Sequence, residues 1–329
     1  MRANKGSFMR YNVLLNIASY SIVLVMLMSC NPDNSRKTSN MFAEFERSEE
    51  LKDYPSGSTI SFYQDKLYLM GDDASSLLIL GKDFKVQEKI PFFPGDAGRI
   101  QKAQKADIES SEWIMNDNEA KHWLFGSGSS SPQRDSAFRF DPETKSVERI
   151  DLSTFYNKLR HSEIRDLNIE GTAMVKNSLL FGSRGNLTNK QNYFIQTSLA
   201  ALSGEGSPRV VALNLPDGMG ISGMSYLADL DILLLTTSTE NTASAYDDGE
   251  IGESCLGVIY HFSDKLSGSS IGTDDWIVLS ELDAVFKGQK IESICTSGVQ
   301  NDGRVSAVLV SDDDKGTTRL FSLKLDFRE

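Results

Sequence analysis

The sequence is poor in the residues from which metal centres and nucleophilic sites are usually built. Among 329 residues there are three cysteines and three histidines, and His122, His161 and His261 are scattered along the chain. No Cys-x-x-Cys pair occurs, and the glycine–serine tract at 126–131 lacks the lysine of a phosphate-binding loop. These absences argue against a zinc or haem site and lend little support to nucleophilic catalysis.

Positive charge is also scarce. Lys and Arg number 34 against 46 Asp and Glu, so the formal net charge is −12. A nucleic-acid-binding protein needs a basic face that displaces counterions from phosphates, and this composition argues against such a partner. The apolar fraction of 40% and the charged fraction of 24% are ordinary for a folded chain, so disorder is not the default interpretation.

Long hydrophobic runs are limited to one segment at residues 13–28, which follows a basic stretch with Arg2, Lys5 and Arg10. Its 16 residues are fewer than the ~20 that a helix needs to cross a bilayer core. A basic start, a short apolar core and a small residue before a cleavage point are typical of a signal peptide. We therefore predict a signal peptide at 1–29, a polar, flexible tether at 30–40, and a folded domain at 41–329.

The end of this segment, Leu27-Met28-Ser29-Cys30, resembles the lipobox of bacterial lipoproteins. The resemblance implies that the thiol of Cys30 is acylated and that the protein is anchored by lipid in the cell envelope, on either face of the outer membrane. The alternative is an ordinary secretory signal with an incidental cysteine. Cys255 and Cys295 would then remain, either as a disulfide or as two buried thiols.

The chain from Ser56 onward consists of short apolar runs separated by polar turns, which is typical of β-strands. A short signature recurs along it, and it is followed each time by a first strand, a second strand that ends in a polar turn, and a third strand. Its marker residues are Ser56, Glu109, Glu170, Ser222 and Glu292. Four strands repeated every fifty to seventy residues predict an all-β fold, a β-propeller with five blades.

Two alternatives to five blades remain open. The fourth unit is long and would give six blades if it contained an extra sheet, and a tandem of β-sandwiches has similar short strands. The fifth unit stops at three strands near Glu329, which would leave an unpaired edge. We therefore predict that residues 41–47 supply the missing outer strand and close the ring.

The first strand of each blade lies nearest the axis of a propeller, so the markers and the polar turns are predicted to converge at one mouth of the central channel. Carboxylates brought together in this way disfavour each other's ionisation and call for basic partners or a hard cation such as Ca²⁺. The mixture of charges also suits a small polar or anionic ligand, such as a phosphate ester. The alternative is that the markers hydrogen-bond to neighbouring blades and are structural. The candidate ligand-binding residues are Glu109, Glu170, Glu292, Ser222, Asp72, Asp73, Arg99, Lys105, Asp107 and Arg184.

A second acidic cluster, Asp247, Asp248 and Glu250, lies in the long loop of the fourth unit. Its oxygens on a tight turn make a weak candidate Ca²⁺ site, although the spacing is not that of an EF-hand. A solvated acidic loop is the simpler interpretation.

Several motifs resemble an uncharacterised family of propeller lipoproteins of Bacteroidetes type over residues 41–329. They include Lys105-Ala-Asp-Ile-Glu109, Asn168-Ile-Glu-Gly171 and Leu180-Phe-Gly-Ser-Arg-Gly-Asn186. Asn168 to Gly171, followed by Gly182 to Gly185, is more distantly similar to phytase-like esterase propellers, which implies hydrolysis of phosphate esters with Ca²⁺. Three hypotheses follow: a membrane-anchored module that binds a ligand at the axial mouth, a hydrolase of phosphate or carboxylic esters, and a platform for a protein partner.

Overall fold

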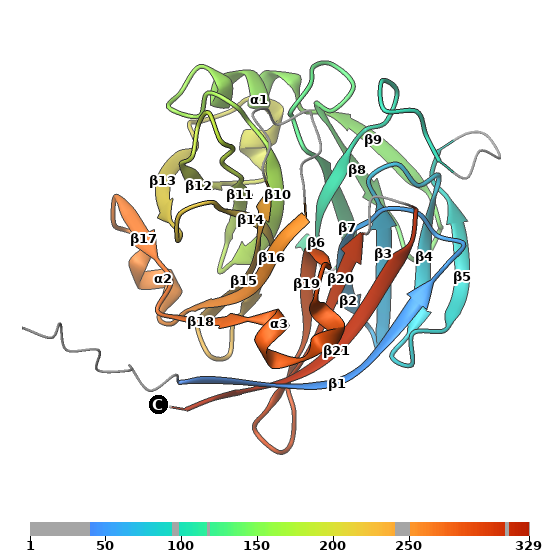
Figure 1. Cartoon of the computed structure of the whole chain (residues 1–329). Coiled ribbons are helices and arrows are strands. Elements are labelled where there is room, and N and C mark those ends of the chain that lie inside the picture. The colour runs from blue at the N-terminus through green and yellow to red at the C-terminus, as the bar shows by residue number, and fades with distance from the viewer. Residues whose placement is uncertain (1–39, 94–98, 117–118, 241–250, 313–315, 329) are drawn as a thin grey trace, which may run out of the picture. The chain divides into compact units, whose positions relative to one another are not determined.

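The computed structural model describes residues 40–93, 99–116, 119–240, 251–312 and 316–328. It is a five-bladed β-propeller, as predicted, with the blades arranged around a central axis (Figure 1). In this part of the chain no helix is both long enough and apolar enough to span a membrane. The candidate Ca²⁺ ligands Asp247, Asp248 and Glu250, and the lipidation candidate Cys30, lie outside the described residues.

Each blade has four antiparallel strands, and in blades 1 to 4 these four run outward from the axis in chain order. Blade 1 contains β2 (Gly57–Tyr63), β3 (Lys66–Gly71), β4 (Ser76–Gly81) and β5 (Val86–Pro91). Blade 2 contains β6 (Ile108–Asn116), β7 (Glu119–Gly126), β8 (Ser136–Phe140) and β9 (Val147–Asp151). Blade 3 contains β10 (Ile169–Val175), β11 (Ser178–Ser183), β12 (Asn192–Thr197) and β13 (Arg209–Asn214).

Blade 4 contains β14 (Met219–Leu227), β15 (Ile232–Glu240), β16 (Ile251–Ile259) and β18 (Asp275–Val278). Blade 5 contains β19 (Lys290–Val299), β20 (Val305–Asp312), β21 (Thr318–Phe327) and the N-terminal strand β1 (Met41–Leu51). The helices are short and lie between strands: α1 (Ser153–Arg160), α2 (Phe262–Lys265), α3 (Leu279–Leu282), and the 3₁₀ turns η1 (Ala200–Ser203) and η2 (Ala284–Phe286).

The hydrophobic core is divided among the five interfaces between neighbouring blades. Each of five apolar clusters draws its residues from two adjacent sheets, as Leu124 of β7 and Met70 of β3 do between blades 1 and 2. Because a blade packs on both of its faces, its inner strands are buried along their length, and all six residues of β4 are buried. This explains why the strands read as continuous apolar runs rather than as a strict alternation.

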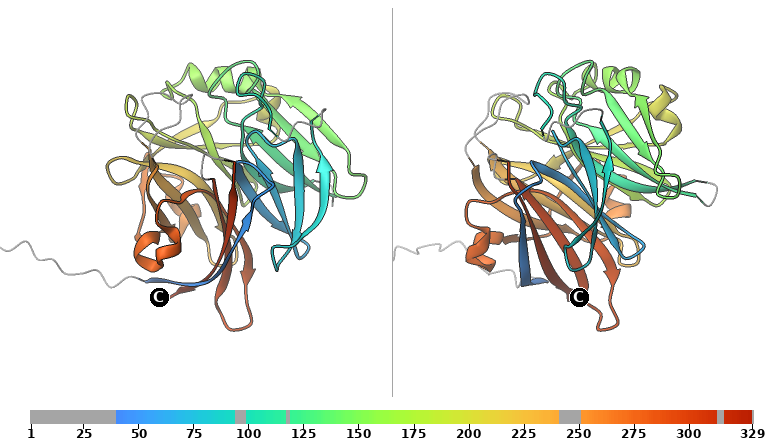
Figure 2. Two further views of the ribbon diagram at one scale, coloured as in Figure 1. Left: turned by 45° about the vertical axis from the view of Figure 1, so that its right-hand side comes forward. Right: turned by 90° about the vertical axis from the view of Figure 1, so that its right-hand side faces the viewer.

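The ring closes in the way that the sequence predicts. β1 runs antiparallel to β21, from Met41 opposite Phe327 to Leu51 opposite Thr318, and both views of Figure 2 show the two strands side by side. The strand is longer than the predicted residues 41–47. A carboxylate from blade 4 fixes its beginning, because Asp275 Oδ2 accepts hydrogen bonds from the backbone N–H groups of Asn40 (2.8 Å) and Met41 (2.9 Å).

The extra length of the fourth unit does not form a sixth blade within the described residues. After β16 the chain crosses to blade 3, where β17 (Ser270–Gly272) pairs in parallel with β13 and becomes a fifth strand of that sheet. Arg209 of β13 reinforces this crossing by donating to the carbonyl oxygens of Ser267 and Gly268, both at 2.6 Å. The insertion therefore joins two blades, and the six-bladed alternative is wrong.

Candidate functional site at the axial mouth

Every innermost strand contains a β-bulge near its start. The pairing with the second strand shifts by one residue at this point in all five blades. A bulge bends the strand and redirects a side chain, and bulges occur often beside functional sites. The five extra residues are Ser58, Glu109, Glu170, Ser222 and Glu292.

Four of the five predicted markers are therefore these bulge residues, and the marker of blade 1 is wrong. The equivalent residue is Ser58 rather than Ser56, because Gly57 occupies the place that an isoleucine takes in the other blades. Without that apolar residue the sequence offers no clear guide to the register.

A second set of equivalent positions lies at the end of the second strands, where each residue directly follows the pairing partner of the residue before the bulge. It comprises Asp72, Ser127, Arg184, Ser238 and Asp312. The backbone N–H groups of Asp72, Ser127 and Arg184 donate to the carbonyl oxygens of Ser56, Asp107 and Asn168, at 3.0, 2.8 and 2.8 Å. The turns and the strand entrances thus meet on one face of the propeller, as predicted. We call the bulge residues, these turn residues and the charged side chains that contact them the axial mouth.

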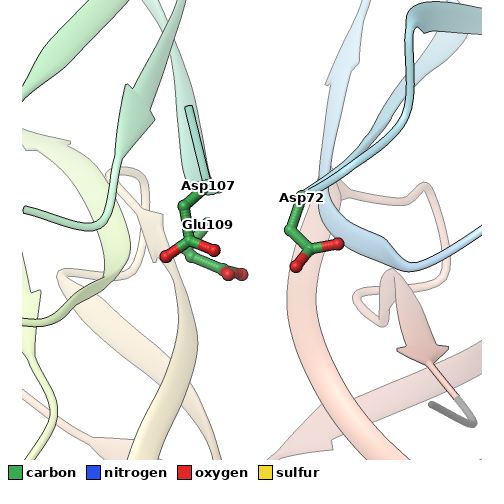
Figure 3. Close-up of side chains that lie close together, drawn as sticks. All are labelled: Asp72, Asp107 and Glu109. Carbon is green, nitrogen blue, oxygen red and sulfur yellow. The ribbon is translucent and has the colours of Figure 1, made fainter. Parts of the chain in front are cut away.

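Three carboxylates come together between blades 1 and 2. Asp72 faces Asp107 and Glu109 across the gap between the blades in Figure 3, and one oxygen from each lies within 4.8 Å of the other two. The ammonium group of Lys105 lies among them, 2.7 Å from Asp107 Oδ1 and in an ion pair with Asp72.

Asp107 is the most heavily bonded member of this acidic cluster. Its Oδ2 accepts hydrogen bonds from Arg134 Nη1 and Ser127 Oγ, both at 2.5 Å, and from Ser129 Oγ at 3.4 Å. Its backbone has φ 57°, a left-handed conformation that costs energy in a residue other than glycine. The surrounding contacts hold this conformation and fix the carboxylate.

Glu109 differs from its neighbours because it has no bonded partner. Within the described ranges no side chain pairs with it or donates a hydrogen bond to it. Burial raises the pKa of Glu109 well above its usual range, and the charges of Asp107, Asp72 and Glu170 add to that rise, while Lys105 opposes it. Glu109 is thus a carboxyl group that gives up its proton less readily than an exposed glutamate does.

The neighbours of Glu109 respond to the same crowding. Burial raises the pKa of Asp72 to about 6, against the opposing charge of Lys105, and Asp72 Oδ1 is buried without a hydrogen-bond partner among the described atoms. Burial alone would lower the pKa of Lys105, but the charges of Asp72, Asp107 and Glu109 outweigh it and raise that pKa. The ammonium group therefore stays charged, and it neutralises only part of the cluster.

The other predicted site residues surround this cluster in separate contacts. Arg99 Nε lies 2.7 Å from Asp73 Oδ2, and the Arg99 side chain is half exposed. Glu170 accepts a hydrogen bond from Asn168 Nδ2 at 2.6 Å, and Glu292 Oε1 lies 3.1 Å from Lys290 Nζ.

The two remaining candidates, Ser222 and Arg184, both contact residues of β15 in blade 4. Ser222 is fully buried, and its hydroxyl donates to Thr236 Oγ1 at 3.2 Å. Its contact is internal, which agrees with the structural alternative. Arg184 Nη2 donates to the carbonyl oxygen and the hydroxyl of Ser238, both at 3.1 Å. Arg184 thus links blades 3 and 4.

The sequence predictions missed Arg134, Ser127, Ser129 and Lys290. Lys290 was within reach, because it stands two residues before the bulge, as Asp107 does. Arg134 was not, because it comes from the loop between β7 and β8 and has no counterpart at a repeated position. Cys255 and Cys295 are both buried and free, so they form no disulfide.

Comparison with known proteins assigns the chain to a family but gives no activity. Residues 53–325 match the model of a family described as a family of unknown function, DUF6929. The chain belongs to this family. The predicted membership of an uncharacterised family is therefore confirmed, whereas the family match says nothing of lipoproteins or phytase-like esterases. No curated protein sequence matches the chain.

Solved structures are similar to this DUF6929 member at low identity. The glutaminyl cyclase of Myxococcus xanthus is 12% identical, with 87% of this chain and 97% of that chain covered and a TM-score of 0.48. A DUF4221 protein of Bacteroides vulgatus is 11% identical, with 88% and 100% covered and a TM-score of 0.41. A protein of unknown function from Dyadobacter fermentans is 9% identical, with 87% and 99% covered and a TM-score of 0.46. These similarities carry no inference about function.

Proposed function

We propose that the axial mouth binds a small polar ligand through a positively charged group of that ligand. The observation that carries this proposal is Glu109, a partly buried carboxyl group at the axis with no bonded partner in the described part of the chain. An ammonium or guanidinium group placed beside Glu109 would gain a charge-assisted hydrogen bond and relieve the repulsion from Asp72 and Asp107.

The charges of the mouth favour a cation over the anion that the sequence suggested. Arg99, Lys105, Arg134 and Lys290 each already pair with an acid, so their charges are engaged. The residues of the mouth described above include seven acids and five bases. These are Asp72, Asp73, Asp107, Glu109, Glu170, Glu292 and Asp312, against Arg99, Lys105, Arg134, Arg184 and Lys290.

The acidic cluster does not fit a resident calcium ion. Ca²⁺ takes six to eight oxygen ligands, whereas the Lys105 ammonium group lies between two of the three carboxylates. An organic ammonium group needs only a few acceptors and can approach Glu109 with Lys105 in place.

Thermal unfolding in the presence of simple ions tests this proposal. We expect putrescine to raise the melting temperature by about 2–4 °C at saturating concentration, and Glu109→Gln to lose that rise. Glu49→Gln, on an exposed position of β1, is the matched control and should keep it. The rise should be larger at pH 8 than at pH 5, because the pKa of Asp72 is about 6 and that of Glu109 is also raised. Stabilisation by inorganic phosphate instead, unaffected by Glu109→Gln, would show that the mouth prefers anions.

A second candidate function is acid–base catalysis at the same site. A carboxyl group with a raised pKa can act as a general acid, and the pKa of Glu109 is raised. Ester hydrolysis of the phytase-like kind would use it to protonate a leaving group. Hydrolysis of p-nitrophenyl phosphate or acetate that disappears in Glu109→Gln and persists in Glu49→Gln would favour this function over simple binding.

We also propose that Cys30 carries the lipid that anchors the protein to the bacterial envelope. The support is the lipobox-like Leu27-Met28-Ser29-Cys30 after a basic and apolar leader. A diacylglycerol on this residue would hold the chain at a membrane because each buried methylene contributes ~0.8 kcal/mol. We expect labelled palmitate to be incorporated into the wild type and not into Cys30→Ala, with Cys255→Ala as the control. Equal labelling of the wild type and Cys30→Ala would contradict the anchor.

A further inference from the structure

A pocket of about 240 Å³ lies between blades 3 and 4, and none of the three carboxylates of the acidic cluster lines it. One wall is the turn between β11 and β12, and the other is the link from β13 to β14. Arg184, a turn residue of the axial mouth, forms its inner side, so the pocket opens on the same face of the propeller as the mouth. Its volume is below the ~300–1,000 Å³ of pockets for drug-sized ligands, which limits an occupant to a small molecule.

The walls of this pocket are fixed by a buried amide. Asn192 is only 3% exposed, and its Oδ1 accepts hydrogen bonds from the backbone N–H of Gly185 (3.0 Å) in one wall and of Ile221 (3.1 Å) beyond the other. Its Nδ2 donates to the carbonyl oxygen of Met219 at 3.1 Å. Because one side chain ties both walls, the cavity exists before any ligand arrives, which reduces the ordering cost of binding.

The first wall is also rigid in itself. The side-chain oxygen of Asn186 accepts from the backbone N–H groups of Thr188 (2.9 Å) and Asn189 (2.8 Å), which closes an Asx-type turn. Gly185 allows the tight path, because a Cβ there would lie 2.5 Å from the carbonyl oxygen of Lys190. The pocket is therefore a built feature of the loop and not a chance gap.

The charge of the pocket is opposite to that of the acidic cluster. Arg184 is 6% exposed and lies over Gly220, where a Cβ would come within 2.6 Å of its Nε. Lys190 stands exposed at the rim, and Asp217 is the acid among the lining residues. Two basic groups against one acid favour an anion, and a guanidinium group suits the planar or tetrahedral oxygens of a carboxylate or phosphate.

The remaining lining combines four amide side chains with a few apolar residues. Leu187 is 46% exposed at the entrance, and Leu213 and Leu215 line the β13–β14 wall. We propose that this pocket binds a small organic anion, with its carboxylate or phosphate group towards Arg184 and Lys190 and a short apolar body against the three leucines. This site is separate from the one proposed at Glu109 and takes a ligand of the opposite charge.

Four probes that contain four carbon atoms each test the class of ligand: sodium butyrate, butyl phosphate, butanol and butylammonium chloride. Binding to the full chain is measured by calorimetry and by shifts of the backbone amide signals of Gly185 and Gly218. We expect butyrate or butyl phosphate to bind saturably and at least tenfold more tightly than butanol or butylammonium. The stronger of the two anions identifies the head group.

Three exposed charges give variants that leave the core intact. Lys190→Met should weaken the binding of the better anion about threefold, and Asp217→Asn should strengthen it by a similar factor, since a charge at the rim acts through solvent. Lys85→Met, on the opposite face in the link between β4 and β5, is the matched control and should leave the affinity unchanged.

Equal binding of butanol and butyrate would overturn the proposal, because the pocket would then be only an apolar cavity. Anion affinities that do not respond to Lys190→Met and Asp217→Asn, or the lack of saturable binding by either anion in the millimolar range, would also overturn it. Glu109→Gln should not change anion binding here. The outcome is therefore independent of the cation site at the axial mouth.

Discussion

At the scale of single residues, Glu112 shows how the channel wall is held together below the mouth. It lies three residues after the bulge in β6, where its carboxylate accepts hydrogen bonds from the backbone N–H of Trp113 (2.7 Å) and of Met174 in the next blade (3.1 Å). Burial raises the pKa of Glu112 to about 7, although both N–H groups act to lower it. The contact gives a hydrogen-bond acceptor to a backbone N–H group of β10. It also leaves the titratable carboxyl group of Glu112 in the channel wall.

This position predicts how stability depends on pH. The folded-state pKa of Glu112 lies above its value in the unfolded chain, so the native state binds the proton more tightly. The contribution of Glu112 to stability is therefore complete below about pH 4.5 and is lost as the pH rises towards 7, a loss of at most about 3 kcal/mol. Urea unfolding from pH 4 to pH 8 should show a smaller fall for Glu112→Gln than for the wild type. The same fall in both proteins would contradict this assignment.

His122 makes stability depend on pH in the opposite direction to Glu112. The wild type must therefore be compared with Glu112→Gln. Burial lowers the pKa of His122 to about 3, and its stabilising contribution is lost as the pH falls below about 6.5. In the wild type the pH dependences of stability due to Glu112 and His122 overlap. The difference between the wild type and Glu112→Gln cancels the part due to His122, because both proteins retain that residue.

At the scale of elements, the closing strand β1 depends on one buried end. Met41 is 1% exposed and packs in the cluster between blades 4 and 5, whereas Phe42, next along the strand, is 42% exposed. We expect Met41→Ala to lower the free energy of unfolding by about 2–4 kcal/mol. Phe42→Ala should cost less than about 1 kcal/mol. Denaturant unfolding measures both, and equal costs would show that β1 is not anchored through Met41.

The elements also show where sequence patterns fail. Apolar runs bounded by polar turns located the inner strands because both faces of a blade are buried. β17 was not predicted, because its three residues take their partner from blade 3 and carry no periodicity of their own. The register of blade 1 was misjudged because Gly57 replaces the apolar residue that marks the bulge elsewhere.

At the scale of the whole molecule, the repeat spacing predicted the ring and therefore the convergence of residues far apart in the chain. Asp72, Lys105 and Glu109 meet because the turn after β3 and the entrance to β6 lie on the same face of neighbouring blades. The sequence could not predict which basic side chains would contact the acidic cluster. Arg134 reaches Asp107 from an irregular loop, and Arg184 donates a hydrogen bond to Ser238 of the next blade. Loop conformations of this kind follow from tertiary contacts and not from a repeated pattern.

The pairing of β1 with β21 also sets the order in which the molecule can be completed. The ribosome makes residues 41–51 among the first of the propeller and residues 318–327 among the last. The fifth blade must therefore await release of nearly the entire polypeptide, and until then β1 presents a bare strand edge that is open to wrong partners. A chain that crosses a membrane before it folds would meet this requirement naturally, because both ends would arrive on the same side before the circle is joined.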